Sequence, residues 1–468
     1  MRAVIRVVLP WTLLALVATP GWSIQSALSS RPGSEIYNPD PQHLWNRLHE
    51  TLLVRVGPSG REYGRDRVDP LLWVGSTYLL QGASHEKAVG LLNEFVATHA
   101  EKLIVDPLKR AILQRDLWMV ADWLDGDHVA SGKPMLNAQA LRAATLRLRR
   151  PLNTAVARLA LTPPQIRQLP DNYAASAAAG GVPSDLFAIG GPWVSVGPSS
   201  GPVAPSHVND EGPGKNSVFL VFIRLPGGRD ATLKYLNRLR SFDEPLWMDT
   251  LDPAMKPFLP YYPNPDVPQF PAGTQVALVR RALLIDSSGE ITPSRLTESV
   301  QLRTYRRIGE MTPQVFLDAH RTEDAFFARA GQDFREFRLS RAALFSGRGG
   351  GLMPVGQDEK DYPTFSAHGN DAFDEAVERS PGGVDADAGR IVAGCHDCHS
   401  APGIYSFNSH YPFRLLSGPA SKGQARLSEL SLADAERIAV SLKRQRPEWR
   451  ALKPLLMREV RAAARVAH

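Results

Sequence analysis

The segment DAGRIVAGCHDCHS, residues 387–400, decides how the C-terminal part of this chain is expected to fold. It contains both cysteines of the 468-residue chain, Cys395 and Cys398. Two thiols three positions apart project from the same side of one helical turn, and His399 follows directly after the second thiol. No other part of the sequence carries comparable chemical information.

The spacing C-x-x-C-H is the attachment sequence of a c-type haem. The two thiols add to the two vinyl groups of the porphyrin, and the histidine binds the iron through a ring nitrogen. The sequence therefore predicts one covalently attached haem c, held by Cys395 and Cys398, with His399 as the proximal iron ligand.

Three other uses of paired cysteines fit these residues less well. A zinc site needs four ligands, of which the two thiols supply half, so His396, His399 or His410 would have to complete it. A thioredoxin-like redox pair requires a βαβ pattern around the motif, and the sequence lacks one. A disulfide between cysteines this close is strained, and it leaves His399 without a role.

Residues 387–400 resemble the N-terminal part of a class I cytochrome c module, in which a short helix leads into the haem signature. Further on, Ser431 and Asp434 form a capping-box arrangement, and apolar residues line one face of the next helix until Pro447 ends it. This helix is similar to the closing helix that covers one haem edge in that family. The resemblance implies an all-α cytochrome c-like haem domain over residues 381–468.

The sixth iron position departs from the family pattern, because no methionine lies between His399 and Ser431. Three states stay open. His410 binds the iron and gives a bis-histidine centre of low potential, or Met353 or Met457 binds and raises the potential. In the third state the position is open or holds water and admits a small ligand or peroxide. A loop histidine without a ligand role explains His410 equally well.

The first residues predict export of the chain. Arg2 and Arg6 precede a short apolar segment at residues 7–18, which Pro10 interrupts and a polar stretch follows. This pattern is typical of a secretory signal peptide, assigned to residues 1–25, with an uncleaved anchor as the alternative. The mature protein is expected in the periplasm or otherwise exported, without a stable membrane span after cleavage.

Composition and periodicity divide the rest of the chain into further parts. The expected parts are a helical region at 36–180, a Gly/Pro/Ser-rich linker at 181–216, a mixed α+β domain at 217–346, a hinge at 347–380 and the haem domain at 381–468. Within them, we expect helices at 84–104, 108–124 and 136–159, with a break at Pro151, and strands at 218–223, 275–285 and 298–306. The predicted fold class is α+β multidomain: an N-terminal helical region, a mixed middle and a C-terminal all-α cytochrome c-like domain.

The composition excludes some partners and leaves others open. A chain with 43% hydrophobic and 22% charged residues is expected to be globular. Its net charge of +6 comes without a concentrated basic and aromatic face, so no nucleic-acid partner is expected. A redox protein partner with an acidic surface would suit this charge. The oligomeric state stays open.

The predicted function is one-electron transfer, as a redox partner or as the redox arm of an oxidoreductase system. One alternative is a haem enzyme or ligand-binding protein, peroxidase-like or gas-binding, with an open sixth iron position. Another is a secreted binding scaffold in which the haem is structural. Residues 36–346 exceed what a simple electron shuttle needs, so they either house a substrate site or dock a partner. Whether the chain is an enzyme stays open.

Overall fold

The computed structural model describes residues 35–56, 62–68, 78–125, 138–198, 216–244, 247–250, 252–254, 256–257, 261–309, 331–359, 392, 399, 402–406 and 427–466. The predicted signal peptide at 1–25 lies outside these residues, as do Cys395, Cys398 and His410. His399 lies within them. The boundaries between the expected parts of the chain stay predictions.

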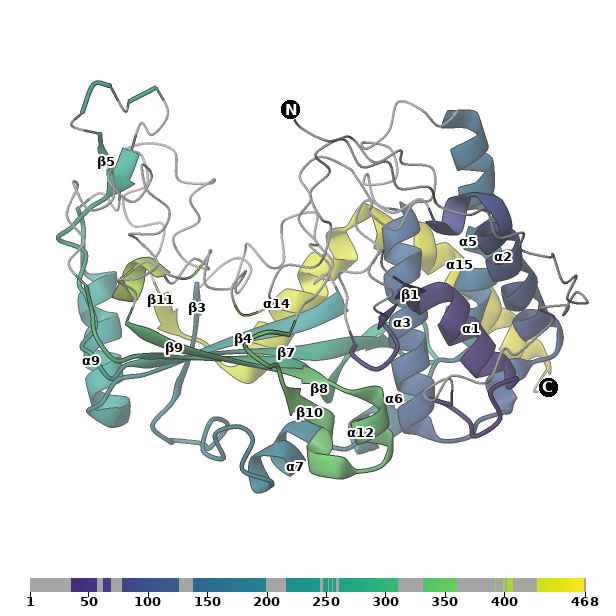
Figure 1. Ribbon diagram of the computed structural model, residues 1–468, viewed down its shortest axis with the longest axis horizontal. Helices are drawn as coiled ribbons and strands as arrows, with labels where there is room; N and C mark the ends of the chain where they lie inside the picture. Colours follow the sequence, from purple (N-terminus) through teal and green to yellow (C-terminus); the bar gives the residue numbers. More distant parts are fainter. Residues whose placement is uncertain are drawn as a thin grey trace, which may run out of the picture.

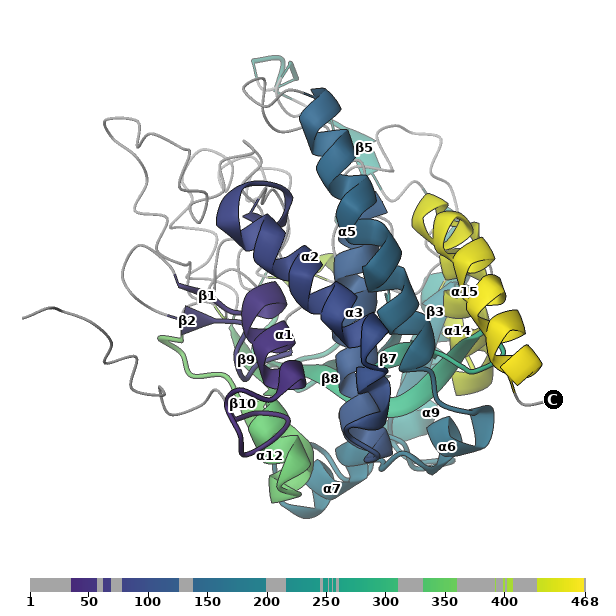
Figure 2. The same ribbon diagram turned by 90° about the vertical axis from the view of Figure 1, so that its right-hand side faces the viewer.

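Helices from both ends of the chain pack into one helical layer (Figures 1 and 2). They are α1 (Leu44–Leu53), α2 (Gly82–Ala97), α3 (Pro107–Asp125), α5 (Ala138–Arg158) and α15 (Pro447–Val466). In α3, the buried Leu113, Leu117, Val120 and Leu124 recur at helical spacing and form the face that meets its neighbours. The layer thus has a continuous apolar core.

Pro151 does not break α5, contrary to the sequence prediction. The helix runs from Ala138 to Arg158 with Pro151 in its interior. A proline removes one helical hydrogen bond, which costs roughly 3 kcal/mol in an isolated helix. On either side of it, Leu148, Leu152 and Ala155 are fully buried in the helical layer. Their packing keeps the helix continuous.

Among the described residues, seven strands form one antiparallel sheet in the order β10-β9-β8-β7-β4-β3-β11. Their bounds are β3 (Val194–Pro198), β4 (Ser217–Arg224), β7 (Gln275–Ile285), β8 (Ile291–Tyr305), β9 (Gln332–Leu339), β10 (Leu352–Pro354) and β11 (Leu427–Glu429). Residues 218–223 of β4 are buried along their whole length, as a continuous apolar run predicts. Figure 1 views the sheet nearly edge-on, with the helical layer at one end of it.

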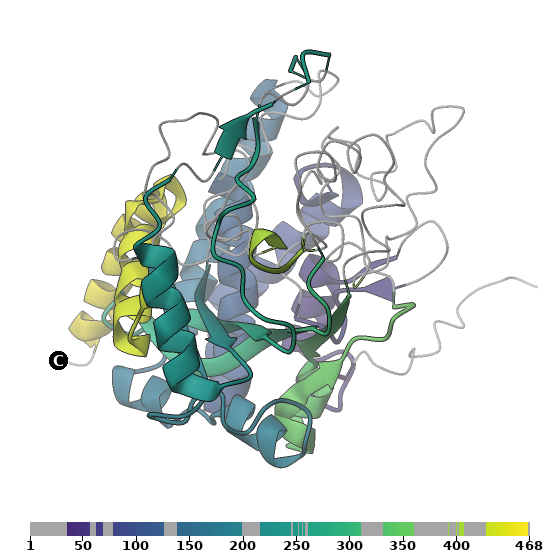
Figure 3. The ribbon, with the colours of Figure 1, turned by 90° about the vertical axis from the view of Figure 1, so that its left-hand side faces the viewer.

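Shorter elements cover the two faces and the ends of the sheet. In Figures 1 and 3, α7 and α12 lie below the sheet, and the turn η5 lies above it. These covering elements are α6 (Pro163–Gln168), α7 (Asn172–Ala178), α9 (Gly228–Arg240), α12 (Arg341–Phe345), η4 (Arg348–Gly351), η5 (Gly403–Ser406) and α14 (Leu432–Gln445). The remaining short pieces are β1 (Arg55–Val56), β2 (Glu62–Tyr63), η1 (Tyr78–Leu80), η2 (Ala100–Lys102), β5 (Trp247–Asp249) and β6 (Tyr261–Pro263).

The C-terminal part of the chain is not an all-α domain, so the predicted fold class is wrong there. Strand β11 forms the edge of the large sheet beside β3, and α14 packs against β4 and β8. Helix α15 packs against α3 and α5 in the helical layer. The prediction failed because an amphipathic helix shows that one face is buried, but not against which partner. Here the partners of α14 and α15 come from earlier in the chain.

Candidate functional site

Of the residues predicted to hold a haem, the structure describes His399. This side chain is buried, with 5% of its surface exposed. Met353 lies in the edge strand β10, opposite Arg338. Met457 lies on α15 beside Gly289, at the end of β8 that is remote from His399. An extended strand spans roughly 40 Å from Ile291 to Arg303, so Met457 and His399 lie near opposite ends of β8.

The surface that holds His399 is formed by two cross-strand pairs near the end of β8. Arg303 on β8 lies opposite Phe334 on β9, and Tyr305 lies opposite Gln332. Side chains alternate along a strand and directly opposed residues share a face, so all four project from the same side of the sheet. Arg303, Tyr305 and Phe334 are buried there. The chain around the haem motif packs against this face.

His399 is bonded to this face through its backbone and its ring. The Gln332 side-chain amide donates a hydrogen bond of 2.8 Å to the His399 carbonyl. The ring Nδ1 lies 2.9 Å from the carbonyl oxygen of Ser406 and 3.1 Å from a guanidinium nitrogen of Arg303. The same Arg303 nitrogen donates to the Ser406 carbonyl at 2.9 Å. Two groups, the Ser406 carbonyl and the Arg303 guanidinium, therefore meet at Nδ1.

These contacts suit a histidine that binds a metal through Nε2. A neutral imidazole carries one ring proton, and a histidine that binds through Nε2 keeps it on Nδ1. The Ser406 carbonyl then accepts the Nδ1 proton with one lone pair and the Arg303 proton with the other. In the opposite tautomer, Nδ1 accepts from Arg303 and Nε2 is blocked by its proton. The distances accommodate both forms, and a metal at Nε2 selects the first.

The turn η5 fixes the Ser406 carbonyl in place. The Gln269 side chain pairs with the backbone of the turn: its oxygen accepts from Ile404 N at 2.7 Å, and its nitrogen donates to the Pro402 carbonyl at 3.4 Å. Tyr405 donates to the Asn264 carbonyl at 2.8 Å. Burial raises the pKa of the Tyr405 phenol, so it stays protonated as this donor requires.

The other end of the turn is bonded to the sheet. The Ser406 hydroxyl donates to the Gly403 carbonyl at 2.7 Å and makes a close contact with the Tyr305 hydroxyl. Ahead of the haem motif, the helical residue Val392 forms a small apolar cluster with Phe334 and Val355. The sheet thus holds the chain on both sides of residues 393–398.

Sequence reasoning predicted a ligand role for His399, which stays a prediction, but gave no sign of the residues that contact it. Arg303, Tyr305 and Gln332 belong to strands, and no motif distinguishes them from other strand residues. Only the β8–β9 register, together with a contact across 96 positions of sequence, brings Arg303 to His399. The glutamine that binds the turn, Gln269, likewise carries no sequence signal.

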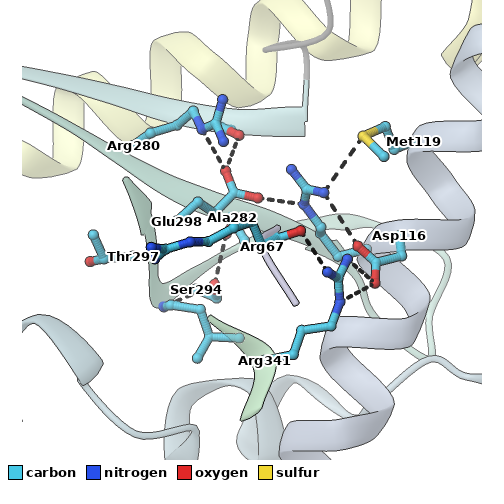
Figure 4. Close-up of polar contacts among 12 residues, drawn as sticks. Arg67, Asp116, Met119, Arg280, Ala282, Ser294, Thr297, Glu298 and Arg341 are labelled. Carbon is cyan, nitrogen blue, oxygen red and sulfur yellow. Dashed lines mark hydrogen bonds and ion pairs between the residues drawn. The ribbon is translucent and has the colours of Figure 1, made fainter. Parts of the chain in front are cut away.

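A second polar cluster lies between the sheet and the helical layer (Figure 4). Glu298 on β8 is buried and pairs with Arg115 of α3 at 2.5 Å and with Arg280 of β7 at 3.1 Å. Next to it, Asp116 pairs with Arg341 of α12 at 2.7 Å. Burial alone would raise the pKa of Glu298, but the two guanidinium groups more than offset it, so this pKa lies below its usual value. These pairs join α3 to β7, β8 and α12.

Comparison of the chain with protein-family models, curated proteins and solved structures finds no match. The site must therefore be interpreted from its own residues. Within the described ranges, no three His, Cys, Asp or Glu side chains gather as they would around a metal ion. No helix in the same ranges is both long and apolar enough to cross a membrane.

Proposed function

We propose that this chain is an exported c-type cytochrome that carries one covalent haem and transfers single electrons, as a redox partner or as the redox arm of an oxidoreductase system. Cys395 and Cys398 would form the thioether bonds, and His399 would be the proximal ligand. The haem, when bound, supplies the one-electron couple. The observation that best supports the proposal is the 2.9 Å contact of the buried His399 Nδ1 with the Ser406 carbonyl.

That contact matters because it prepares Nε2 for iron. A ligand histidine generally donates its other ring N–H to a carbonyl, a carboxylate or a water, which fixes the tautomer and the ring orientation. The Ser406 carbonyl has this role here, and Gln269 and Tyr305 hold the turn that carries it. The protein thus orients the ring by fixed groups that belong to the sheet and the turn.

The character of the acceptor favours electron transfer over peroxide chemistry. A carboxylate at Nδ1 would strengthen the basicity of the ring and its electron donation to the metal. The Ser406 carbonyl is neutral, and it also accepts a hydrogen bond from the Arg303 cation. A carbonyl that is already polarised by a cation is a weaker acceptor for the Nδ1 proton. The ring therefore donates less to the metal than it would with a carboxylate at Nδ1.

Within this proposal, His410 is the candidate distal ligand, on the sequence evidence alone. A second histidine would close the sixth position and suit a carrier of electrons. Replacing His410 by Ala is expected to convert a low-spin absorption spectrum into one of an open or water-bound iron. An unchanged low-spin spectrum would exclude His410 as the ligand.

The proposal as a whole is tested by the mass of the exported protein. The full chain is produced in a bacterial host that attaches c-type haem, alongside the double variant Cys395→Ala/Cys398→Ala. We expect the intact mass of the unaltered protein to exceed that of its polypeptide by one haem, and the variant to lack this addition. An unaltered protein without the added mass would falsify the proposal.

A carbon monoxide titration separates electron transfer from ligand binding. The reduced, haem-loaded protein is mixed with carbon monoxide and its absorption spectrum is recorded. A closed centre binds the gas slowly or not at all, whereas rapid binding favours a gas-binding or peroxidase-like protein. Reversible oxidation and reduction by small mediators is expected as well, and its failure would favour a structural haem.

A further inference from the structure

Arg303 is a buried cation at the place where the proposed iron ligand is oriented. It projects from β8 with 5% of its surface exposed, and its guanidinium lies 6.0 Å from the ring centre of Tyr305. One of its nitrogens contacts His399 Nδ1, the Ser406 carbonyl and, at 3.4 Å, the Ser406 hydroxyl. A guanidinium keeps its charge at any physiological pH. The positive charge is therefore permanent.

This charge acts on the ligand in two ways that add together. It polarises the carbonyl that accepts the Nδ1 proton, which weakens electron donation from the ring to the metal. It also creates a positive potential in a buried site, where charges interact more strongly than in water. Both effects disfavour the oxidised iron, which carries one more positive charge than the reduced iron.

We propose that Arg303 is a positioning residue that holds the His399 ring through the shared Ser406 carbonyl and raises the reduction potential of the haem. The inference rests on the proposed function and adds to it the residue that sets the potential from the proximal side. Arg303 acts through His399 and Ser406.

The test compares the midpoint potentials of haem-loaded variants of the full chain. Arg303→Gln removes the charge but keeps a hydrogen-bond donor, and Arg303→Lys keeps the charge. Arg306→Gln is the matched control, because Arg306 lies three positions further along the chain, with an exposed side chain paired to Asp333. Each protein is titrated with redox mediators, and its absorption spectrum is recorded in both oxidation states.

Arg303→Gln is expected to lower the potential, so that the ratio of reduced to oxidised protein falls about tenfold at a fixed ambient potential, which is about 59 mV for one electron. Arg303→Lys is expected to recover most of this shift, and Arg306→Gln to change the ratio less than twofold. An Arg303→Gln protein that carries haem and keeps the unaltered potential overturns the inference. If Arg303→Lys does not restore the potential, the positive charge of Arg303 is not what raises it.

If Arg303→Gln does not fold, a measurement on the unaltered protein tests the arrangement around the Ser406 carbonyl. The ring signals of His399 are assigned in nitrogen-15 NMR spectra of the reduced protein. We expect Nδ1 to carry a proton that is protected from solvent exchange. An Nδ1 without a proton overturns the shared-carbonyl arrangement. A protein that lacks covalent haem contradicts the proposed function instead, so the two failures are distinguishable.

Discussion

At the scale of single residues, Gly403 is the position where the turn beside His399 tolerates least change. Its φ of +52° lies in the left-handed region, which residues with a side chain rarely adopt. A Cβ built on Gly403 would lie 2.1 Å from the side-chain oxygen of Gln269. That oxygen also accepts from Ile404 N. A side chain at position 403 would therefore both strain the backbone and displace the Gln269 side chain.

We therefore predict that Gly403→Ala lowers the free energy of unfolding by about 2–4 kcal/mol, from backbone strain plus the loss of a partly buried hydrogen bond. Gly180→Ala is the control, because Gly180 has a φ of +77° but no atom within 4 Å of its ideal Cβ. The control is expected to lose only about 1–2 kcal/mol. Urea denaturation of both variants measures the difference, and equal losses would contradict the role given to Gln269.

Glu298 makes stability depend on pH. Its pKa in the folded protein lies below the ordinary glutamate value of 4.5, so the folded state favours the carboxylate more than the unfolded state does. The resulting stability is present above pH 4.5 and is lost as the pH falls through the lower folded-state pKa. We predict that thermal unfolding scans show this loss, and that Glu298→Gln flattens the acid limb of the curve.

Glu298→Gln is also expected to destabilise the folded protein at neutral pH. Glu298→Gln leaves the buried Arg115 and the partly buried Arg280 beside a neutral amide, which is expected to lower the free energy of unfolding by roughly 3–5 kcal/mol. Glu290→Gln is the control, because the Glu290 side chain is exposed and its pairs with Arg444 and Lys453 lie at the surface, where ion pairs contribute little. A Glu298→Gln protein with an unaltered acid limb would show that this carboxylate does not set the pH dependence.

At the scale of elements, local patterns predicted where most helices and strands lie. The expected strand at 275–285 coincides with β7, and the expected helix at 108–124 falls within α3. The expected helix at 84–104 was too long, since α2 ends at Ala97 and His99 adopts a left-handed conformation with a φ of 54°. Apolar periodicity marks a buried face but gives no warning of such a local stop.

These local patterns do not predict which elements pack against one another in the folded chain. The sequence predicts the amphipathic faces of α14 and α15, but the same faces would suit a small haem module equally well. The site shows the same limit. The C-x-x-C-H motif singles out His399, but the pairing of β8 with β9 is needed to bring Arg303 and Gln332 beside it. Register depends on the whole sheet, so a single segment cannot reveal it.

The packing of α15 into the helical layer has a testable energetic consequence. Leu452 of α15 has 1% of its surface exposed, whereas Leu146 of α5 has 60%. We predict that Leu452→Ala lowers the free energy of unfolding by about 2–5 kcal/mol, and that Leu146→Ala changes it by less than about 0.5 kcal/mol. Denaturation of both variants provides the measurement, and similar small effects would contradict the packing of α15.

At the scale of the whole molecule, the chain after the C-x-x-C-H motif completes both parts of the fold. Strand β11 extends the large sheet, α14 packs on β4 and β8, and α15 enters the helical layer beside α3 and α5. The apolar faces of these elements are therefore buried against residues that precede the motif. A fragment that begins after β10 lacks all of those partners.

We predict that residues 381–468, expressed alone in a host that attaches haem, do not fold cooperatively. Without β3, β4 and α3, the C-terminal elements have no apolar surface on which to bury their own, and short isolated helices are marginal in water. Circular dichroism during heating measures this, with the full chain as the control. A sharp unfolding transition of the fragment would restore the independent haem domain.

Strand β8 has one further consequence for the proposed electron transfer. One end of it follows the turn at Gly289 and Glu290, to which Lys453 of α15 is bonded. The other end carries Arg303 and Tyr305 beside His399. A redox centre on His399 would be anchored to the main body and could not travel on a tether, so the partner would have to approach and dock for each exchange.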